Sequence, residues 1–331
     1  MKIKLSFVLI FLWIIQTKAQ STKGITGKRD TGYSTFQAFN SVKKSHPNIP
    51  VSMVVDKTPP SVNERRNVIF ATIGNRNLQL GAFFPKKKTK KGRIAVLIIH
   101  GGGWRTGNRS QHIPLAQHLA ARGFVCFTAE YRLSTEALFP AAVHDLKAAI
   151  RWMRANAKTY HIDTNRIATV GFSAGGQLSA LLGNTGDNPK LEGAIGTLGH
   201  SSKVNAIVDI DGILAFIHPE SGEGDDRRNT SAATNWFGFS KTENPDLWRE
   251  GSALTYANAQ TPPTLFLNSA VERMHAGRTD YLKILDANKI YSEVHTLPDS
   301  PHSFCLFNPW FEPTVVFIDA FLKKNLNGKS K

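Results

Sequence analysis

Acidic residues are few in this chain. The 331 positions hold 25 Asp and Glu residues against 41 Lys and Arg residues, and the formal net charge is +16. Such an excess attracts polyanions, so nucleic acid, an anionic membrane surface and an acidic polysaccharide are all candidate partners. Two lysine clusters, at 86–91 and in the C-terminal KKNLNGKSK, equally fit a solvated turn and a frayed end. The chain has no basic recognition helix and no aromatic-interleaved sheet motif, which argues against nucleic acid.

Cysteine is almost absent as well, since Cys126 and Cys305 are the only two. In an exported protein they could pair. Cys126, however, lies in the apolar run GFVCF, where a buried strand is expected, and this favours a small buried thiol. His, Cys and Asp residues form no cluster at metal-ligand spacing. The sequence therefore predicts neither a metal nor another cofactor.

Long hydrophobic runs are lacking, with one short exception at the N-terminus. Lys2 and Lys4 precede an apolar run from Leu5 to Ile15, and the small residues Thr17 and Ala19 follow it. This is the pattern of a secretory signal peptide cleaved after Ala19. The run is about half as long as a membrane-spanning helix requires. We therefore expect a secreted or periplasmic protein with a signal peptide over 1–19 and no integral membrane segment after its removal.

The hydrophobic pattern changes along the rest of the chain. Residues 20–62 are polar and indicate an N-terminal extension with one short helix near 36–42. The stretches NVIFATIG and LQLGAFFP, separated by the turn-prone 75–77, predict an antiparallel hairpin. Beyond residue 93, continuous apolar runs alternate with helical patterns, which predicts a mostly parallel sheet with helices on both faces. The fold class is therefore α/β, with one domain over 63–331 that carries a cap or lid insertion at 212–258.

One serine stands where a buried strand is predicted to turn into a helix. In TVGFSAGGQL, Ser173 is flanked by Gly171 and Gly175 at the GxSxG spacing. A serine in such a sharp turn has its hydroxyl exposed at the carboxyl edge of the sheet, and the glycines let strand and helix approach closely. Ser173 is therefore a candidate nucleophile.

A glycine-rich motif, HGGGWRTG at 100–107, follows an earlier strand. Glycines allow backbone N–H groups to turn inward and donate to the oxyanion that forms when a serine attacks an ester carbonyl. We expect these donors to be Gly102, Gly103 and Ala174, the last at the positive end of a helix dipole. The alternative, a phosphate-binding loop, is disfavoured because no lysine-serine ending follows.

A nucleophilic serine needs a base, and His302 is the best candidate among eleven histidines. It lies in DSPHSF, after the last predicted strand and before the final helix, where a loop returns to the carboxyl edge of the sheet. His100 is better explained as a support for the glycine turn. His144, within a helical pattern, is better explained as a core or surface residue.

Taken together, HGGGW, GFSAGG and PHSF, with FPAAVHDLKAAIRW between the first two, resemble the α/β-hydrolase family, in its hormone-sensitive-lipase and carbohydrate-esterase branch. The likeness covers nearly the whole chain after the extension, from about residue 68 to 326. The segments PPTLFLNSAVERMHAGRTD and YSEVHTLPDSPHSFCLFNPWF are similar to secreted esterases of plant cell-wall polysaccharides, including pectin esterases. The resemblance implies an α/β-hydrolase fold, a catalytic domain over 63–331 and a serine esterase mechanism.

The resemblance also implies a triad acid, and here the chain departs from the family. An aspartate usually follows the strand represented by TLFLN, but this chain has NSAVERMHAG. Glu272 lies one place from the expected position and is our first candidate to orient the imidazole of His302. Asp211, at the end of the strand VNAIVDI, and Asp280 are alternatives, as is a dyad without an acid.

The substrate is inferred from the residues around these motifs. The insertion is polar with isolated aromatics, as in GEGDDRRNTSAATNWFG, which suits sugars better than long acyl chains. Trp104 and Trp236 are candidates to stack on sugar rings, although either fits a packing role as well. Arginine matches carboxylate geometry bidentately, so the arginines that follow motif residues are candidates to bind uronic acids. These arginines are Arg105, Arg109, Arg273 and Arg278.

These observations predict a secreted serine esterase of acidic plant cell-wall polysaccharide. Pectin is the favoured substrate, through methyl esters of galacturonate or acetyl esters of sugar hydroxyls. An acetyl xylan esterase or a feruloyl esterase is the alternative. A hypothesis of another class is a catalytically silent hydrolase fold that binds polysaccharide, because a fold by itself does not establish a function.

Overall fold

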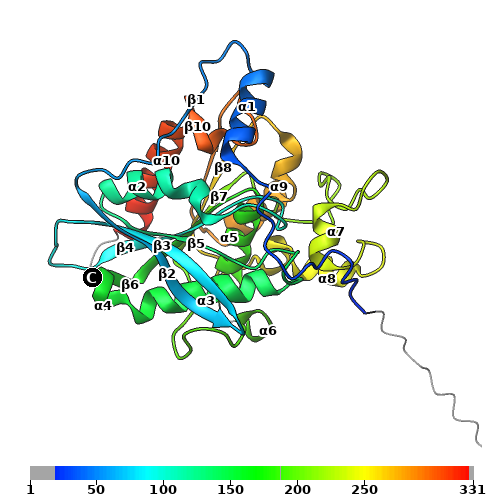
Figure 1. Cartoon of the computed structure of the whole chain (residues 1–331), viewed down its shortest axis with the longest axis horizontal. Helices are drawn as coiled ribbons and strands as arrows, with labels where there is room; N and C mark the ends of the chain where they lie inside the picture. Colours follow the sequence, from blue (N-terminus) through cyan, green and yellow to red (C-terminus); the bar gives the residue numbers. More distant parts are fainter. Residues whose placement is uncertain (1–18, 187, 328–331) are drawn as a thin grey trace, which may run out of the picture.

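The computed structural model describes residues 19–186 and 188–327, so the predicted signal peptide lies outside the described residues apart from Ala19. The chain folds into an eight-stranded sheet with helices on both faces and a small two-stranded pairing beside it (Figure 1). Within the described ranges, no helix combines the length and the apolar character that crossing a bilayer requires.

The large sheet confirms the predicted α/β class. In spatial order the strands are β2 (Val62–Ile73), β3 (Arg76–Pro85), β5 (Val125–Ala129), β4 (Arg93–Ile99), β6 (Ile162–Phe172), β7 (Ala206–Ile210), β8 (Thr264–Asn268) and β9 (Ser292–Thr296). The two strands of the predicted hairpin, β2 and β3, pair antiparallel, and β3 also pairs antiparallel with its other neighbour, β5. All other neighbouring strands of this sheet are parallel. All carboxyl ends of the parallel strands therefore meet at one edge.

Helices alternate with the parallel strands, as predicted, and a 3-10 turn, η1 (Arg109–His112), directly precedes the helix at Ile113–Ala121. The helices of the main body are α1 (Thr35–Ser45), α2 (Ile113–Ala121), α3 (Ala141–Ala155), α4 (Ala157–Tyr160), α5 (Ala174–Asn184), α6 (Pro189–Glu192), α9 (Arg278–Ala287) and α10 (Phe311–Leu326). The long α3, α5 and α10 leave the sheet covered on both sides, as continuous apolar strands require.

The core consists of two apolar layers, one on each face of the sheet, because successive residues of a strand point to opposite sides. In β4, Leu97 joins the layer that contains residues of α3 and α5. Val96 and Ile98 join the other layer, which α2 and α10 cover. Both layers consist of residues that are almost fully buried.

The N-terminal extension packs against this body. β1 (Ser52–Met53) pairs antiparallel with β10 (Phe307–Asn308), which lies close to the other end of the chain. Val42 of α1 and Val51 also belong to the apolar layer that α2 and α10 cover. The predicted short helix is confirmed and is longer than expected, since α1 extends over Thr35–Ser45.

The insertion predicted at 212–258 lies between β7 and β8. It contains α7 (Ala232–Phe237), α8 (Pro245–Glu250) and the 3-10 turn η2 (Ala253–Tyr256). Figure 1 shows the dark blue start of the described chain beside α7 and α8. Hydrogen bonds join the start of the described chain to the insertion. Ser21 N–H donates to Gly238 O at 2.6 Å, and Gln20 Nε2 donates to Phe237 O at 3.0 Å.

Candidate active site

Ser173 occupies the turn between β6 and α5, as the GxSxG spacing predicts. Its backbone has φ 58° and ψ −122°, a conformation that costs energy for a residue with a side chain. The flanking glycines are required by close approach. A Cβ on Gly171 would lie 1.8 Å from Gly175 O, and one on Gly175 would lie 2.2 Å from Ile99 O. Strand and helix therefore meet without side chains between them, and the serine side chain is only partly buried.

His302 and Asp211 complete a hydrogen-bonded line with this serine. His302 Nε2 lies 2.8 Å from Ser173 Oγ, and His302 Nδ1 lies 2.9 Å from Asp211 Oδ2. Ser173 follows β6 and Asp211 follows the adjacent β7, while His302 comes from the loop after β9. The three side chains meet because they all leave the sheet at its carboxyl edge.

The prediction that Glu272 is the first candidate for the triad acid was wrong. Glu272 is exposed in η3 (Glu272–His275), the turn after β8, and Asp211 occupies the position beside His302. The physical reason is strand order: β7 adjoins β6, whereas β8 lies one strand further away. The other alternative, Asp280, is paired with Lys283 at 2.8 Å and lies 3.3 Å from His218.

Asp211 is held ionised although it is fully buried. Burial alone would raise the pKa of its carboxyl, but the neighbouring His275, His302 and Ser269 N–H lower the pKa below the usual value. Ser269 N–H donates to Asp211 Oδ1 at 2.7 Å, and His275 Nε2 lies 3.4 Å from the same oxygen. Sequence reasoning missed His275, because its approach to Asp211 depends on how η3 folds back after β8.

The glycine motif lies directly against the serine. A Cβ on Gly101 would lie 3.1 Å from Ser173 Cβ. The turn is closed by Arg105 and Thr106, whose N–H groups donate to Gly102 O at 3.2 and 3.0 Å. Gly102 has φ 123°, and a Cβ there would lie 2.2 Å from Thr106 O. Glycine is therefore required at this turn.

The expected oxyanion donors lie on the two sides of Ser173. Gly102 and Gly103 belong to the glycine turn, and Ala174 is the first residue of α5. Within the described ranges, none of these three N–H groups donates a hydrogen bond to another backbone group. Their role in binding an oxyanion stays a prediction.

His100 supports the glycine turn, as the sequence indicated. Its Nδ1 lies 2.8 Å from Gly101 O, and its ring stacks on Tyr131 with the centroids 4.4 Å apart. Burial lowers the pKa of His100 to about 3, helped by the nearby charge of Arg29. The imidazole is therefore neutral at physiological pH.

The tryptophans expected to stack on sugars are packing residues instead. Trp104 and Trp236 are buried and stack on each other, with ring centroids 5.0 Å apart and an interplanar angle of 14°. Trp104 Nε1 donates to Gln177 Oε1 at 2.9 Å. This corrects the prediction that Trp104 binds substrate, because its ring face is covered by the insertion and its only donor is used.

Of the four arginines expected near the site, three line two different pockets and one does not line either. Arg273 and Arg278 line a pocket of about 620 Å³ that also contains His275 and Ser269, the neighbours of Asp211. Arg105 lines a different pocket of about 700 Å³, between the insertion and the start of the described chain. Arg109 is held at the hairpin, 3.6 Å from Glu130 and 3.3 Å from Gln79 Oε1. The roles of Arg105, Arg273 and Arg278 in binding substrate stay predictions.

The structure also shows where the two cysteines and the possible metal-ligating side chains lie. Cys126 and Cys305 are both buried free thiols, so they do not form a disulfide with each other. Over residues 19–186 and 188–327, no group of three or more His, Cys, Asp or Glu side chains is arranged to hold a metal ion.

Known proteins share this fold and its motifs. Esterase LipC of Mycobacterium tuberculosis is 29% identical over 81% of this chain and 69% of its own length. The probable carboxylic ester hydrolase LipM of the same organism is 31% identical over 70% of this chain, which spans only 54% of LipM. The structure of a truncated carbohydrate esterase from gut microbiota has a TM-score of 0.66 and 24% identity, over 82% of this chain and 99% of that one; this similarity shows the fold.

The sheet, the GxSxG turn and the related esterases define a carboxylic ester hydrolase of the α/β-hydrolase class. Within that class the chain belongs to the BD-FAE family, whose model matches residues 80–274. None of these comparisons supports pectin as the substrate. The family favours the acetyl and feruloyl esters that were the alternative in the sequence analysis.

Proposed function

We propose that this protein is a serine carbohydrate esterase that removes acetyl or feruloyl groups from a polysaccharide, with Ser173, His302 and Asp211 as its catalytic residues. The hydrogen-bonded line of 2.8 and 2.9 Å through these three side chains is the observation that carries the proposal. The family of bifunctional acetyl/feruloyl esterases supports the choice of acyl group.

The geometry supports an acyl-enzyme mechanism. His302 Nε2 accepts the proton of Ser173 Oγ as the oxygen attacks the ester carbonyl, and Asp211 stabilises the imidazolium that forms. The N–H groups of Gly102, Gly103 and Ala174 donate to the oxyanion. When the intermediate collapses, the bond to the sugar oxygen breaks, and this oxygen takes the proton from His302 and leaves as a hydroxyl. Water then attacks the acyl-serine by the same route and releases acetate or ferulate.

Release of acid from esterified polymers tests this function. Wild-type protein is incubated with acetylated xylan and with feruloylated arabinoxylan, and acetate and ferulate are measured. Ser173→Ala, with 4-nitrophenyl acetate as a small substrate, is the control for the nucleophile. We expect acid release by the wild type and none by the variant. A wild type that binds these polymers without hydrolysing any ester would support the catalytically silent alternative.

A second candidate is the pectin esterase that the charge predicts. The pocket with Arg273 and Arg278 lies beside Asp211, and the Arg273 side chain is 57% exposed, so it can meet a uronate. The same pocket contains Glu220 and Glu272, which offset much of this charge. Methanol or acetate released from pectin, at a rate above that of acetate from xylan, would favour this candidate.

We also propose that the protein is exported and that its signal peptide ends at Ala19. Polysaccharides of plant cell walls are met outside the cell that makes the enzyme, which fits the charged and apolar pattern of residues 1–19. N-terminal sequencing of the exported protein should begin at Gln20. An exported protein that begins at Met1 would contradict the proposal.

A further inference from the structure

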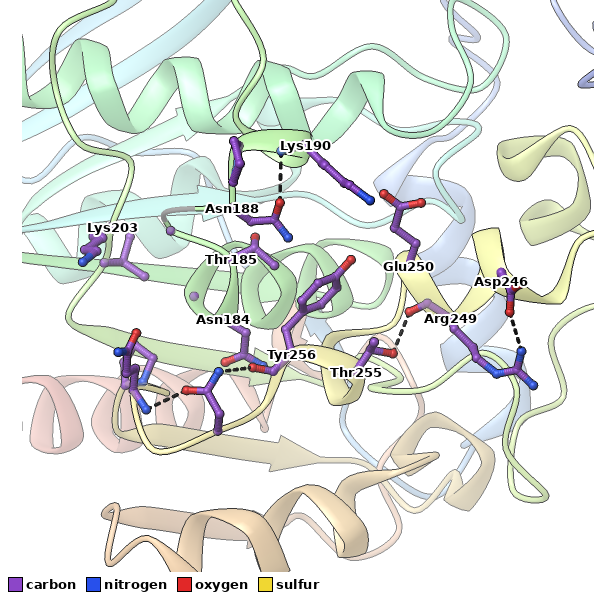
Figure 2. A pocket seen from close by; sticks show the side chains of 17 residues that line it. Asn184, Thr185, Asn188, Lys190, Lys203, Asp246, Arg249, Glu250, Thr255 and Tyr256 are labelled. Atoms are coloured by element: carbon purple, nitrogen blue, oxygen red, sulfur yellow. Dashed lines mark hydrogen bonds and ion pairs between the residues drawn. The ribbon is translucent and has the colours of Figure 1, made fainter.

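A larger pocket lies at the end of α5 opposite to Ser173. Its volume is about 920 Å³, and its walls are the end of α5 with α6 on one side and α8 with η2 on the other. Figure 2 shows the side chains that line it. Because α5 has 11 residues, the pocket and the serine are separated by about 16 Å along the helix. It is therefore a separate site and not part of the ester-binding centre.

This pocket is lined by charged side chains of both signs. Arg249 Nη1 is paired with Asp246 Oδ1 at 2.8 Å on one rim. The other charged side chains are the basic Lys190 and Lys203 and the acidic Glu250. An anionic ligand would face two carboxylates here and a cationic ligand would face three basic groups. The pocket therefore suits a molecule without net charge.

Hydrogen bonds hold the polar walls in place. Asn184 Nδ2 donates to Ala253 O and its Oδ1 accepts from Tyr281, both at 2.9 Å. Thr255 Oγ1 donates to Arg249 O at 2.7 Å. The bond from Asn184 to Ala253 joins α5 to the insertion, and the bond from Thr255 to Arg249 lies within the insertion, so both walls are held in place before any ligand arrives. A preformed pocket loses less conformational freedom on binding.

Several polar groups of the pocket remain available for a ligand. No hydrogen bond within the described part of the chain involves the Tyr256 hydroxyl, the side-chain amide of Gln260 or the charged side-chain groups of Lys190 and Glu250. In Figure 2, Tyr256 lies between the two walls, with Thr185 on one side and Glu250 on the other. Donors and acceptors are thus both offered, around a half-buried aromatic ring.

Sugars match this combination. Each sugar hydroxyl both donates and accepts a hydrogen bond, and the apolar face of a sugar ring packs on an aromatic side chain. A tyrosine hydroxyl is protonated at physiological pH and can donate, and burial raises the pKa of Tyr256 further, to about 12. A volume of about 920 Å³ is large enough for sugar residues.

We propose that this pocket is a second binding site for an uncharged stretch of polysaccharide, with Tyr256 as the stacking residue and Lys190, Glu250 and Gln260 as hydrogen-bonding partners. The proposal rests on the proposed function in its choice of polymer. A polymer held here brings its other residues near the ester-binding edge, so the site raises the local concentration of substrate without taking part in the chemistry.

Binding to an ester-free polymer tests the site without depending on catalysis. Ser173→Ala is titrated with soluble xylan from which alkali has removed the esters, and the affinity is compared with that of the same protein carrying Tyr256→Ala. We expect Tyr256→Ala to weaken binding about tenfold, as loss of a central aromatic contact does. Tyr256→Phe, which keeps the ring, should lose much less. Tyr291→Ala, an exposed tyrosine elsewhere, is the matched control and should bind like the parent.

Kinetics then separate this site from the proposed function. In the catalytically active protein, Tyr256→Ala should raise KM for acetylated xylan about tenfold and leave kcat/KM for 4-nitrophenyl acetate unchanged, which also shows that the variant is folded. Equal affinity of Tyr256→Ala and its parent for ester-free xylan would overturn the second site. If the wild type released no acid from any polymer while the Tyr256 effect on binding persisted, the proposed function would fail and the sugar site would stand. Should Tyr256→Ala fail to fold, Glu250→Gln with Gln260→Ala must weaken binding for the proposal to survive.

Discussion

At the residue scale, the two carboxylates considered as partners of His302 differ completely in their surroundings. Asp211 is buried and lies 2.9 Å from His302 Nδ1, whereas Glu272 is exposed on a 3-10 turn. We predict that Asp211→Asn lowers kcat by about 10³- to 10⁴-fold, because an amide can no longer stabilise the imidazolium or select its tautomer. Glu272→Gln, the matched control, should change kcat less than about twofold. Steady-state rates with 4-nitrophenyl acetate measure both, and a large loss in Glu272→Gln alone would contradict this assignment.

A second residue-scale prediction concerns His112, which is buried and whose two ring nitrogens have no hydrogen-bond partner among the described residues. Burial lowers the pKa of His112 from 6.5 to about 3. Between these two values the unfolded chain binds a proton that the folded protein does not, so stability falls as the pH falls through this window. We expect His112→Leu to unfold at a higher urea concentration than the wild type near pH 5, with a smaller difference at pH 8. A difference that does not depend on pH would contradict the prediction.

Some of these residues could be predicted from the sequence and others could not, for a physical reason. Ser173 and the glycines around it could be predicted because the tight turn between strand and helix is set by the backbone of five consecutive residues. The partner of His302 depends on which strand lies beside β6, and no spacing along the chain encodes that neighbour. The same holds for Trp104, whose burial depends on an insertion that returns more than 100 residues later. Local chemistry was thus predictable, and contacts between distant segments were not.

At the scale of elements, the stretch before α1, which includes Arg29 and Tyr33, contacts the glycine turn through hydrogen bonds. Arg29 Nη2 donates to Gly107 O at 2.9 Å and Nη1 donates to Tyr131 O at 3.2 Å. Tyr33 N–H donates to Thr106 Oγ1 at 3.0 Å. The polar composition of 20–62 indicated an extension, but in the structure this stretch holds the turn that carries the expected oxyanion donors. Arg29 is thus a positioning residue.

This arrangement predicts a specific kinetic defect. We expect Arg29→Ala to lower kcat about tenfold to a hundredfold with little change in KM, because small displacements of catalytic groups are costly while the substrate still binds. Guanidinium added to the variant should restore part of the activity, since it can occupy the space of the missing side chain. Lys28→Ala, a change at the exposed neighbouring residue, is the matched control and should behave like the wild type. A rise in KM without a fall in kcat, or no rescue, would argue against a positioning role.

At the scale of the whole molecule, part of the net charge of +16 lies far from the site. The exposed lysines at 86–91 lie in the loop that leads into β4, and this strand begins at Arg93. That loop is at the amino edge of the parallel strands, opposite to the edge where Ser173 and His302 meet. Other basic residues serve the fold: Arg132 pairs with the buried Asp145 at 2.7 Å. A high charge is therefore weak evidence for an acidic substrate.

This distribution leads to a prediction that separates the two candidate substrates. Raising the salt from about 0.01 M to 1 M shortens the Debye length from roughly 30 Å to 3 Å. We expect KM for acetylated xylan to change less than about twofold over this range, because an uncharged polymer gains nothing from distant lysines. A triple variant, Lys87→Gln with Lys88→Gln and Lys90→Gln, should also keep the wild-type KM. If hydrolysis of pectin exceeded that of xylan at low salt and was lost at high salt, the charge would have a role in substrate binding, and the acidic polymer would become the better candidate.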